Sequence, residues 1–235
     1  MQKLIILLIM ASIIFVGCGT DGAKYEVTYC QNDKEVAKVT FSENGSIIKK
    51  TGQIPDGIVK GYGKNGILVS EGNYLNGKKN GLVKDYYENG AVSSEWNFKA
   101  DKEDGICKNY DKKGNISMLW TFKEGKKDGL YRTYYASGKP WSEINFKNDK
   151  KDGLEKQYYK NGNIESESNY IDGKLSGLSK SYYENGVIKD IATNKNGYCV
   201  NDKNYDEKGK LISNKDYPSN DSKDKPPKVD SIKIK

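Results

Sequence analysis

The chain has 235 residues, of which 35% are hydrophobic, and its mean hydropathy is −0.83. This composition excludes a thick globular core, while 18 Tyr, 5 Phe and 3 Trp exclude a wholly disordered chain. The formal net charge is +7, but Arg132 is the only Arg and His is absent. These features argue against dedicated nucleic-acid readout and against most acid–base and metal chemistry, so we expect no catalytic residues, no cofactor and no nucleic-acid partner.

Residues 1–17 have the pattern of a signal peptide. Lys3 supplies a positive end, and residues 4–16 form an apolar run of about 13 residues, shorter than the roughly 20 that span a membrane. Gly17 precedes Cys18 in a junction that resembles a bacterial lipobox, whose Cys receives a lipid anchor; the alternative is an ordinary signal peptide. Gly19, in place of Asp, does not favour inner-membrane retention. We therefore predict an exported chain, lipidated at Cys18 and anchored to the bacterial cell envelope, at the outer membrane or the cell surface.

Residues 18–54 are expected to form a tether followed by a divergent N-terminal capping hairpin. A strand-like segment at residues 25–29 and a turn at Asn44-Gly45 carry this expectation, and neither follows the spacing of the repeats that come next.

Residues 55–199 consist of six consecutive copies of a 24-residue repeat, visible as columns of like residues. Glycines recur at 57, 81, 105, 129, 153 and 177, and again at 66, 90, 114, 138, 162 and 186. The Tyr column comprises Tyr62, Tyr86, Tyr110, Tyr134, Tyr158 and Tyr182. A turn column comprises Gly77, Asp101, Gly125, Asp149, Gly173 and Gly197. Because Gly and Asp both tolerate positive φ, this turn column predicts one shared backbone conformation.

Each copy is predicted to be a β-hairpin, and the second copy illustrates the two possible registers. A two-residue Asn-Gly turn would pair Lys84 with Glu95, whereas a three-residue turn with a Gly bulge would pair Lys84 with Ser94. Side-chain alternation favours the three-residue turn. It would place on one face Leu82, Tyr86, Val92, Trp96 and Phe98. It would place on the other Asp85, Ser93, Glu95 and Asn97.

Stacked hairpins of this kind predict an all-β fold, an elongated single-layer antiparallel sheet in which each copy contacts only its neighbours. Residues 200–217 are expected to form a degenerate repeat and C-terminal cap, with Tyr205 and Gly209 kept but the spacing broken. Residues 218–235 are polar and contain Pro, and we expect a disordered tail.

The columns resemble MORN repeats, specifically their bacterial antitoxin-like variant. The matching pattern is Asp-Gly-Leu, then Tyr-Tyr, then Gly, shown by Asp128-Gly129-Leu130 with Tyr134-Tyr135 and Gly138, while Gly63 and Asp111 depart from the second Tyr. The resemblance implies an elongated sheet that contacts proteins or lipids and carries no catalytic residues. The antitoxin label concerns cytoplasmic partners, which an exported chain would not meet.

A basic column lies two residues before the Tyr column and comprises Lys60, Lys84, Lys108, Arg132, Lys156 and Lys180. Together the two columns form a candidate binding site for an anionic lipid or glycan; alternatively, the Lys stems only cover apolar surface. An acidic column comprises Glu71, Glu95, Glu143 and Glu167 and is interrupted by Leu119 and Ile191. Its adjacent members are about 9.5 Å apart, too far to share one metal. Cys30, Cys107 and Cys199 lack metal-type spacing, and we predict no disulfide between Cys30 and Cys199.

The sequence therefore predicts a non-enzymatic, envelope-anchored lipoprotein that mediates protein–protein interaction through its repeat sheet. The partner would be an unknown envelope or surface protein, with the membrane contacted through the N-terminal lipid. The alternative is a binder of anionic lipid or glycan through the Lys and Tyr columns, and an enzyme ranks third.

Overall fold

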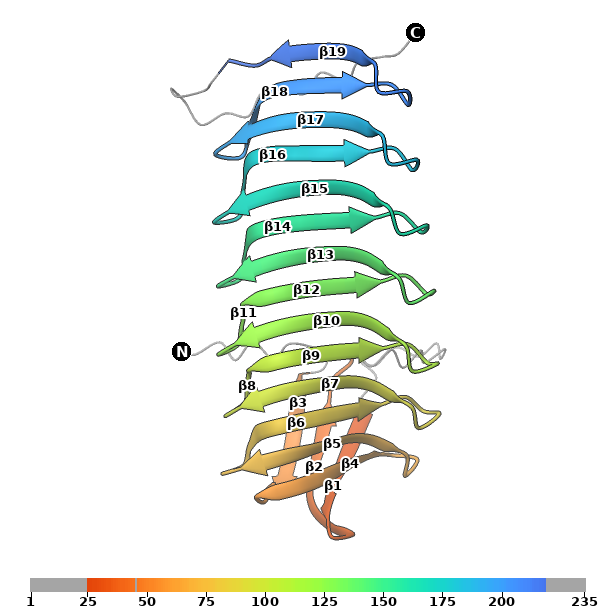
Figure 1. Ribbon diagram of the computed structural model, residues 1–235. Helices are drawn as coiled ribbons and strands as arrows, with labels where there is room; N and C mark the ends of the chain where they lie inside the picture. The colour runs from red at the N-terminus through yellow and green to blue at the C-terminus, as the bar shows by residue number, and fades with distance from the viewer. Residues whose placement is uncertain (1–24, 45, 219–235) are drawn as a thin grey trace. The chain divides into compact units, whose positions relative to one another are not determined.

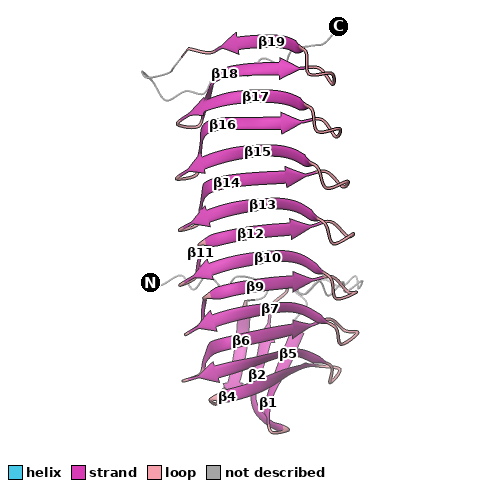
Figure 2. Cartoon of the chain, viewed as in Figure 1, coloured by secondary structure: helices cyan, strands magenta, loops and turns pink. Residues whose placement is uncertain are grey.

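The computed structural model describes residues 25–44 and 46–218, and every regular element in these ranges is a β-strand (Figures 1 and 2). The 19 strands belong to one antiparallel sheet, with the hairpins in chain order. Two compact units divide the described residues: an N-terminal unit that ends at Gly129 and also takes in residues 136–138, and a C-terminal unit of residues 130–135 and the described residues from Lys139 on. The predicted signal peptide, Cys18 and nearly all of the predicted tail lie outside the described residues. Within the described residues, the predicted all-β fold of 24-residue hairpin repeats is confirmed.

The N-terminal unit contains eleven of the strands. They are β1 (Tyr25–Gln31), β2 (Lys34–Phe41), β3 (Ile47–Gly52), β4 (Gly57–Gly63), β5 (Leu68–Leu75), β6 (Lys78–Tyr86), β7 (Val92–Lys99), β8 (Lys102–Glu103), β9 (Gly105–Tyr110), β10 (Ile116–Lys123) and β11 (Lys126–Lys127). Strand β1 pairs with both β2 and β4, so the cap strands join the first repeat directly.

The C-terminal unit contains the remaining eight strands, apart from the first residue of β12. They are β12 (Gly129–Tyr134), β13 (Pro140–Lys147), β14 (Lys150–Tyr158), β15 (Ile164–Ile171), β16 (Lys174–Tyr182), β17 (Ile188–Lys195), β18 (Tyr198–Tyr205) and β19 (Leu211–Asp216). From β13 on, each strand pairs antiparallel with the next.

The turn column adopts the single conformation that the sequence predicts. Its six residues have φ between 68° at Asp101 and 90° at Gly197, and the residue before each has φ between 49° and 53°. Two successive residues at positive φ form the turn type that suits the twist of a β-hairpin. Ala100 and Glu124 are the exceptions in composition, since their φ values of 49° and 50° are ones that residues other than Gly, Asn and Asp adopt at a cost.

The register within each hairpin differs from the prediction. The three-residue loop is confirmed, because the Tyr87 amide donates to the Ala91 carbonyl across residues 88–90. The predicted pairing of Lys84 with Ser94 is wrong: Lys84 pairs with Glu95, and Tyr86 pairs with Val92. Ser93 is the extra residue, a β-bulge that shifts the register by one beyond the loop.

This bulge reverses the predicted division of side chains between the two faces. Val83 pairs with Trp96, so the aromatic residues of β7 lie on the face opposite Lys84 and Tyr86. Glu95 instead shares the face of Lys84. We call the face that bears the basic column the front face and the face that bears Val83 and Trp96, or their equivalents, the back face.

The three cap strands cover part of the back face of the N-terminal unit, and Figure 1 shows them behind β4 to β7. The side chains buried in this region are Val27, Ala37, Val39, Val59, Tyr74, Val83 and Trp96. The first repeat makes room with Gly61, where an added Cβ would lie 3.0 Å from Cγ1 of Val27 and 2.5 Å from Oγ of Ser70. Later copies have larger residues there, such as Asp85 and Asn109. The cap therefore fits against the first copy because that copy lacks a side chain.

Residues 198–216 form a seventh hairpin despite their broken spacing. Tyr205 pairs with Leu211, and the Asp206 amide donates to the Lys210 carbonyl, as in the other copies. The strand that begins this copy has a bulge against the preceding strand. A single residue, Val200, lies there between the paired residues Cys199 and Asn201, whereas the preceding copy has three unpaired residues at the equivalent place. The shortened bulge accounts for the lost spacing, because this copy lacks the first Gly of the repeat.

Candidate functional site

On the front face of the N-terminal unit, basic and acidic side chains alternate from strand to strand. The register places Glu71 between Lys60 and Lys84, and Glu95 between Lys84 and Lys108. The Nζ–Oε distances are 4.0 Å for Lys60–Glu71, 3.8 Å for Lys84–Glu95 and 3.9 Å for Lys108–Glu95. Each pair is partly exposed, so each contributes roughly 0–1 kcal/mol to stability.

The C-terminal unit repeats this alternation. Arg132 Nη2 lies 2.7 Å from Glu143 Oε1, and Lys156 Nζ lies 3.6 Å from Glu167 Oε1. Lys180 pairs in register with Glu167 on one side and with Ile191 on the other. The acidic column was expected on the opposite face, and the bulge brings it onto the front face. The basic column is thus part of an alternating array rather than an uninterrupted row of cations.

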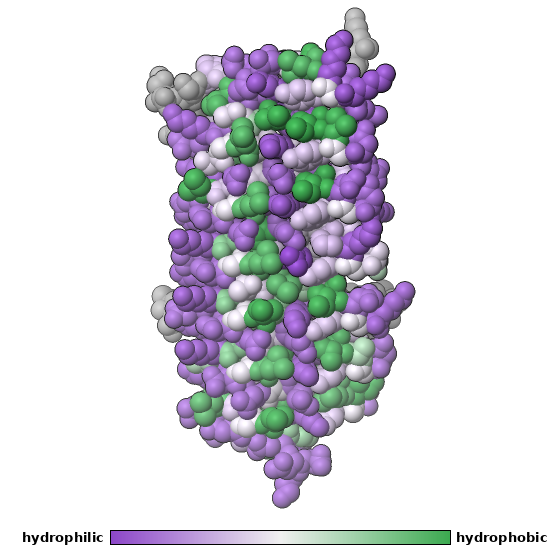
Figure 3. Space-filling model, in the orientation of Figure 1, coloured by the Kyte–Doolittle hydropathy of each residue, from purple (hydrophilic) through white to green (hydrophobic). Residues whose placement is uncertain are grey.

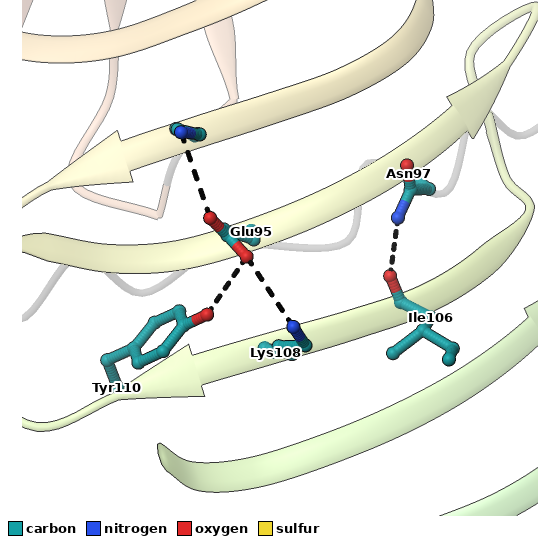
Figure 4. Close-up of polar contacts among 6 residues, drawn as sticks. Glu95, Asn97, Ile106, Lys108 and Tyr110 are labelled. Carbon is teal, nitrogen blue, oxygen red and sulfur yellow. Dashed lines mark hydrogen bonds and ion pairs between the residues drawn. The ribbon is translucent and has the colours of Figure 1, made fainter. Parts of the chain in front are cut away.

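The Tyr column lies on the same face, and some of its hydroxyls hydrogen-bond the carboxylates. Figure 4 shows Glu95 Oε2 accepting from the Tyr110 hydroxyl at 2.9 Å, beside its ion pair with Lys108. Burial, and then the hydrogen bond to Glu95, raise the pKa of Tyr110 to about 12, so the hydroxyl stays a donor. Tyr182 donates to Glu167 in the same way at 3.3 Å. The predicted site residues Lys84, Lys108 and Tyr110 are therefore brought together, with Glu95 as their shared partner.

An apolar column next to these ion pairs remains in solvent. The residues after the first Gly column are exposed by 62% at Ile58, 41% at Leu82, 49% at Ile106 and 50% at Leu178. Figure 3 shows apolar side chains among polar ones on this face. Asn97 lies opposite Leu82 and donates its amide to the Ile106 carbonyl at 2.7 Å (Figure 4). Asn145 and Asn169 repeat this contact with the next copy. The front face thus combines exposed aliphatic groups with fixed polar neighbours.

A second Tyr column, to which the sequence analysis assigned no role, links adjacent copies. The Tyr87 hydroxyl donates to the Tyr110 carbonyl at 2.6 Å. The same bond joins Tyr135 to Tyr158 at 2.5 Å, Tyr159 to Tyr182 at 2.7 Å and Tyr183 to Tyr205 at 2.9 Å. The Tyr-Tyr pair in the sequence is the signal that could have predicted this contact between copies. The first ring of the pair faces the carboxylates, and the second ring, on the opposite face of the sheet, reaches the following copy.

Five segments of the chain match the family model of the MORN repeat variant. They are residues 55–76, 79–100, 127–148, 151–172 and 175–196. Residues 55–196 are MORN-variant repeats. The third copy falls outside the matched segments but keeps the fold, since β9 pairs with β10 in the same bulged register. No curated protein matches the chain. MORN repeats are generally non-catalytic.

The back face of these MORN-variant repeats changes character between the units. In the N-terminal unit Trp96, Cys107 and Phe122 form a buried cluster, with Phe98 and Trp120 against it. In the C-terminal unit the buried side chains are polar: Thr133, Ser142, Glu155 and Asn194. Lys151 Nζ lies 2.7 Å from Glu155 Oε2, which compensates that carboxylate. Among the described residues, the buried apolar side chains of the back face therefore belong to the unit that carries the cap.

Cys30, Cys107 and Cys199 are free thiols. Cys107 is fully buried, and this burial raises the pKa of its thiol to about 11. Within residues 25–44 and 46–218, no cluster of three or more Cys, Asp or Glu side chains could hold a metal ion. None of the described segments is a helix of the length and hydrophobicity that crossing a membrane requires.

Proposed function

We propose that this chain is a non-enzymatic binding protein, exported and lipid-anchored to the bacterial cell envelope through Cys18. It holds an envelope or surface protein on the front face of its MORN-variant repeats. The repeat family supports a binding role, and the lipobox-like junction at Cys18 supports the anchor.

The observation that carries the proposal is the apolar column of Ile58, Leu82 and Ile106 on three consecutive copies. These side chains are 41–62% exposed on a face that the cap strands leave open. Protein interfaces typically combine an apolar centre with a polar rim. Here the ion pairs of Glu71 and Glu95 lie beside the apolar column and supply such a rim.

Substitution of the column tests the proposal. The variant Ile58→Ser, Leu82→Ser, Ile106→Ser removes exposed groups only, so the fold is expected to persist. The control variant Ile47→Ser, Ile48→Ser removes two equally exposed aliphatic groups from the cap strand β3, each 49% exposed. In pull-downs from envelope extract, the partner recovered by the wild-type protein should be lost with the first variant and kept with the control. Equal recovery by both variants contradicts the proposal.

The anchor has its own test, because Cys18 lies outside the described residues. Metabolic labelling with a radioactive fatty acid should mark the wild-type protein and leave Cys18→Ala unlabelled. Label on Cys18→Ala, or none on the wild type, contradicts the proposed anchor while leaving the front face untouched.

Binding of an anionic lipid or glycan through the basic and Tyr columns stays a prediction with less support. The carboxylates of Glu71, Glu95, Glu143 and Glu167 alternate with the cations and reduce their attraction for an anion. The resemblance to antitoxin-like relatives adds no partner, since a cytoplasmic toxin would not meet an exported chain.

A further inference from the structure

Trp141, in the C-terminal unit, is a large aromatic side chain left half in solvent, with 50% of it exposed. Its position in the repeat is the bulge position. The other copies have there Val69, Ser93, Ser117, Glu165 and Lys189. A bulge therefore does not require a Trp, and the second and third copies form the same hairpin with Ser. The exposed indole needs a reason other than folding.

Trp141 forms an aromatic platform with Tyr135. Their ring centroids are 6.3 Å apart with an interplanar angle of 46°. The Tyr135 hydroxyl donates to the Tyr158 carbonyl, which fixes the phenol ring. Tyr159 occupies the same position one copy further on and is held in the same way by the Tyr182 carbonyl. The rings are thus positioned by the sheet rather than free to rotate.

A carboxylate accompanies these rings. After the effect of burial, the negative charge of Glu165 raises the pKa of both Tyr135 and Tyr159, so Glu165 lies near both phenols. Glu184 adds a second negative charge near Tyr159. The nearby amine of Lys139 is bound to the Asn161 carbonyl at 3.0 Å. Aromatic faces next to a carboxylate attract a cation through both the ring quadrupole and the opposite charge.

In the sixth copy, the chain itself supplies a cation to the equivalent aromatic ring. Lys189 occupies the bulge position there, and its Nζ lies 5.8 Å from the ring centroid of Tyr183, the equivalent of Tyr135 and Tyr159. The fourth and fifth copies keep the Tyr but have Trp141 and Glu165 in place of the Lys. They therefore offer the ring and the counter-charge without supplying the cation.

We propose that Trp141, Tyr135, Tyr159 and Glu165 form a binding site for a cationic side chain, Arg or Lys, of a protein partner. The guanidinium or ammonium group lies against the aromatic rings and pairs with the Glu165 carboxylate. Alternation along the strand places Tyr135 on the face opposite Tyr134, so this site is separate from the front-face column of the proposed function. Loss of either site leaves the other intact.

The test titrates the full mature chain with a hexa-arginine peptide at low salt, followed by calorimetry and by indole fluorescence. The wild-type protein should bind the peptide with a change in Trp fluorescence, whereas a hexaglutamate peptide should not bind. Trp141→Ser, which installs the residue of the second and third copies, should weaken binding at least about fivefold. Glu165→Lys supplies an internal cation, as Lys189 does, and should weaken binding at least as much.

Glu88→Lys is the matched control, since it makes the same charge change at an exposed loop residue of the N-terminal unit. It should leave the affinity unchanged, and circular dichroism should show the same fold for all variants. The proposal is overturned if the wild-type protein does not bind the peptide, if Trp141→Ser binds as tightly as wild type, or if Glu88→Lys weakens binding as much as Glu165→Lys.

Discussion

The hydroxyl of Tyr159 offers a direct test of how adjacent copies are held together. It donates a 2.7 Å hydrogen bond to the Tyr182 carbonyl of the next copy, and Tyr135 and Tyr183 make the equivalent bond within the same unit. Tyr159→Phe removes this oxygen and keeps the ring, so packing is preserved while one link between copies is lost.

The expected loss of stability follows from the chemistry of one hydrogen bond. A typical intramolecular hydrogen bond contributes about 0.5–1.5 kcal/mol net. The contact is partly buried, so we expect Tyr159→Phe to lower the free energy of unfolding by about 1 kcal/mol. Adding Tyr183→Phe should bring the total to about 2 kcal/mol, since repeat stability is close to additive over neighbouring joints.

Urea denaturation followed by circular dichroism measures this loss, and Tyr62→Phe is the control. Tyr62 belongs to the first Tyr column, and its hydroxyl makes no hydrogen bond to any residue that the structure describes, so its variant should stay within about 0.5 kcal/mol of wild type. The reasoning is refuted if Tyr159→Phe is as stable as wild type, or if Tyr62→Phe loses as much.

Three further predictions concern single residues. Ala100 has a φ of 49°, and Asn stands at the equivalent positions 76, 148 and 196. Ala100→Asn should therefore raise the free energy of unfolding by about 1 kcal/mol, measured by urea denaturation, because Asn tolerates this φ better than Ala. An unchanged free energy of unfolding would contradict this expectation. Burial and a hydrogen bond to Asp202 raise the pKa of Asp190 to about 7. A carboxyl with a raised pKa stabilises the fold where only the folded state keeps its proton, so protection of β17 and β18 in hydrogen exchange should fall from about pH 4 to about pH 7 in wild type but not in Asp190→Asn. Cys107 should react with a thiol reagent only after denaturation, while Cys30 and Cys199 react in the folded protein; rapid reaction of all three in Cys18→Ala would contradict its burial.

The repeat, its turns and its hairpins could be predicted from the sequence because each rests on local chemistry. The turn column has Gly77 in one copy and Asp101 in the next, and the two residue types share a tolerance of positive φ. Both residues adopt a positive φ in the structure, as this shared property predicted. The three-residue loop before Ala91 followed from the spacing of Gly90 and the strands.

The register could not be predicted because its cause has no residue signature. The bulge residue is Ser93 in one copy, Glu165 in another and Lys189 in a third, so no column marks it. Side-chain alternation across an unbulged pair therefore gave the wrong partner for Lys84 and the wrong face for Trp96. A prediction about faces that relies on counting from a turn fails when one unmarked residue is inserted.

The packing of the cap was also beyond local pattern. Gly61 stands where the second copy has Asp85, a difference that makes sense only once β1 is seen to pair with β4. An added Cβ at Gly61 would lie 3.0 Å from Cγ1 of Val27 in β1. The contact between the cap and the first copy joins segments far apart in the chain, and its only sequence signal is this missing side chain.

Site-specific photo-cross-linking in living cells can show whether the front face holds a protein partner. A photoreactive amino acid is placed at position 82 or 106 on the front face, and at position 48 on the cap strand as a control of similar exposure. We expect light-dependent adducts with one protein partner from positions 82 and 106 and none from position 48. Adducts of the same partner from position 48, or none from the front face, would contradict this expectation.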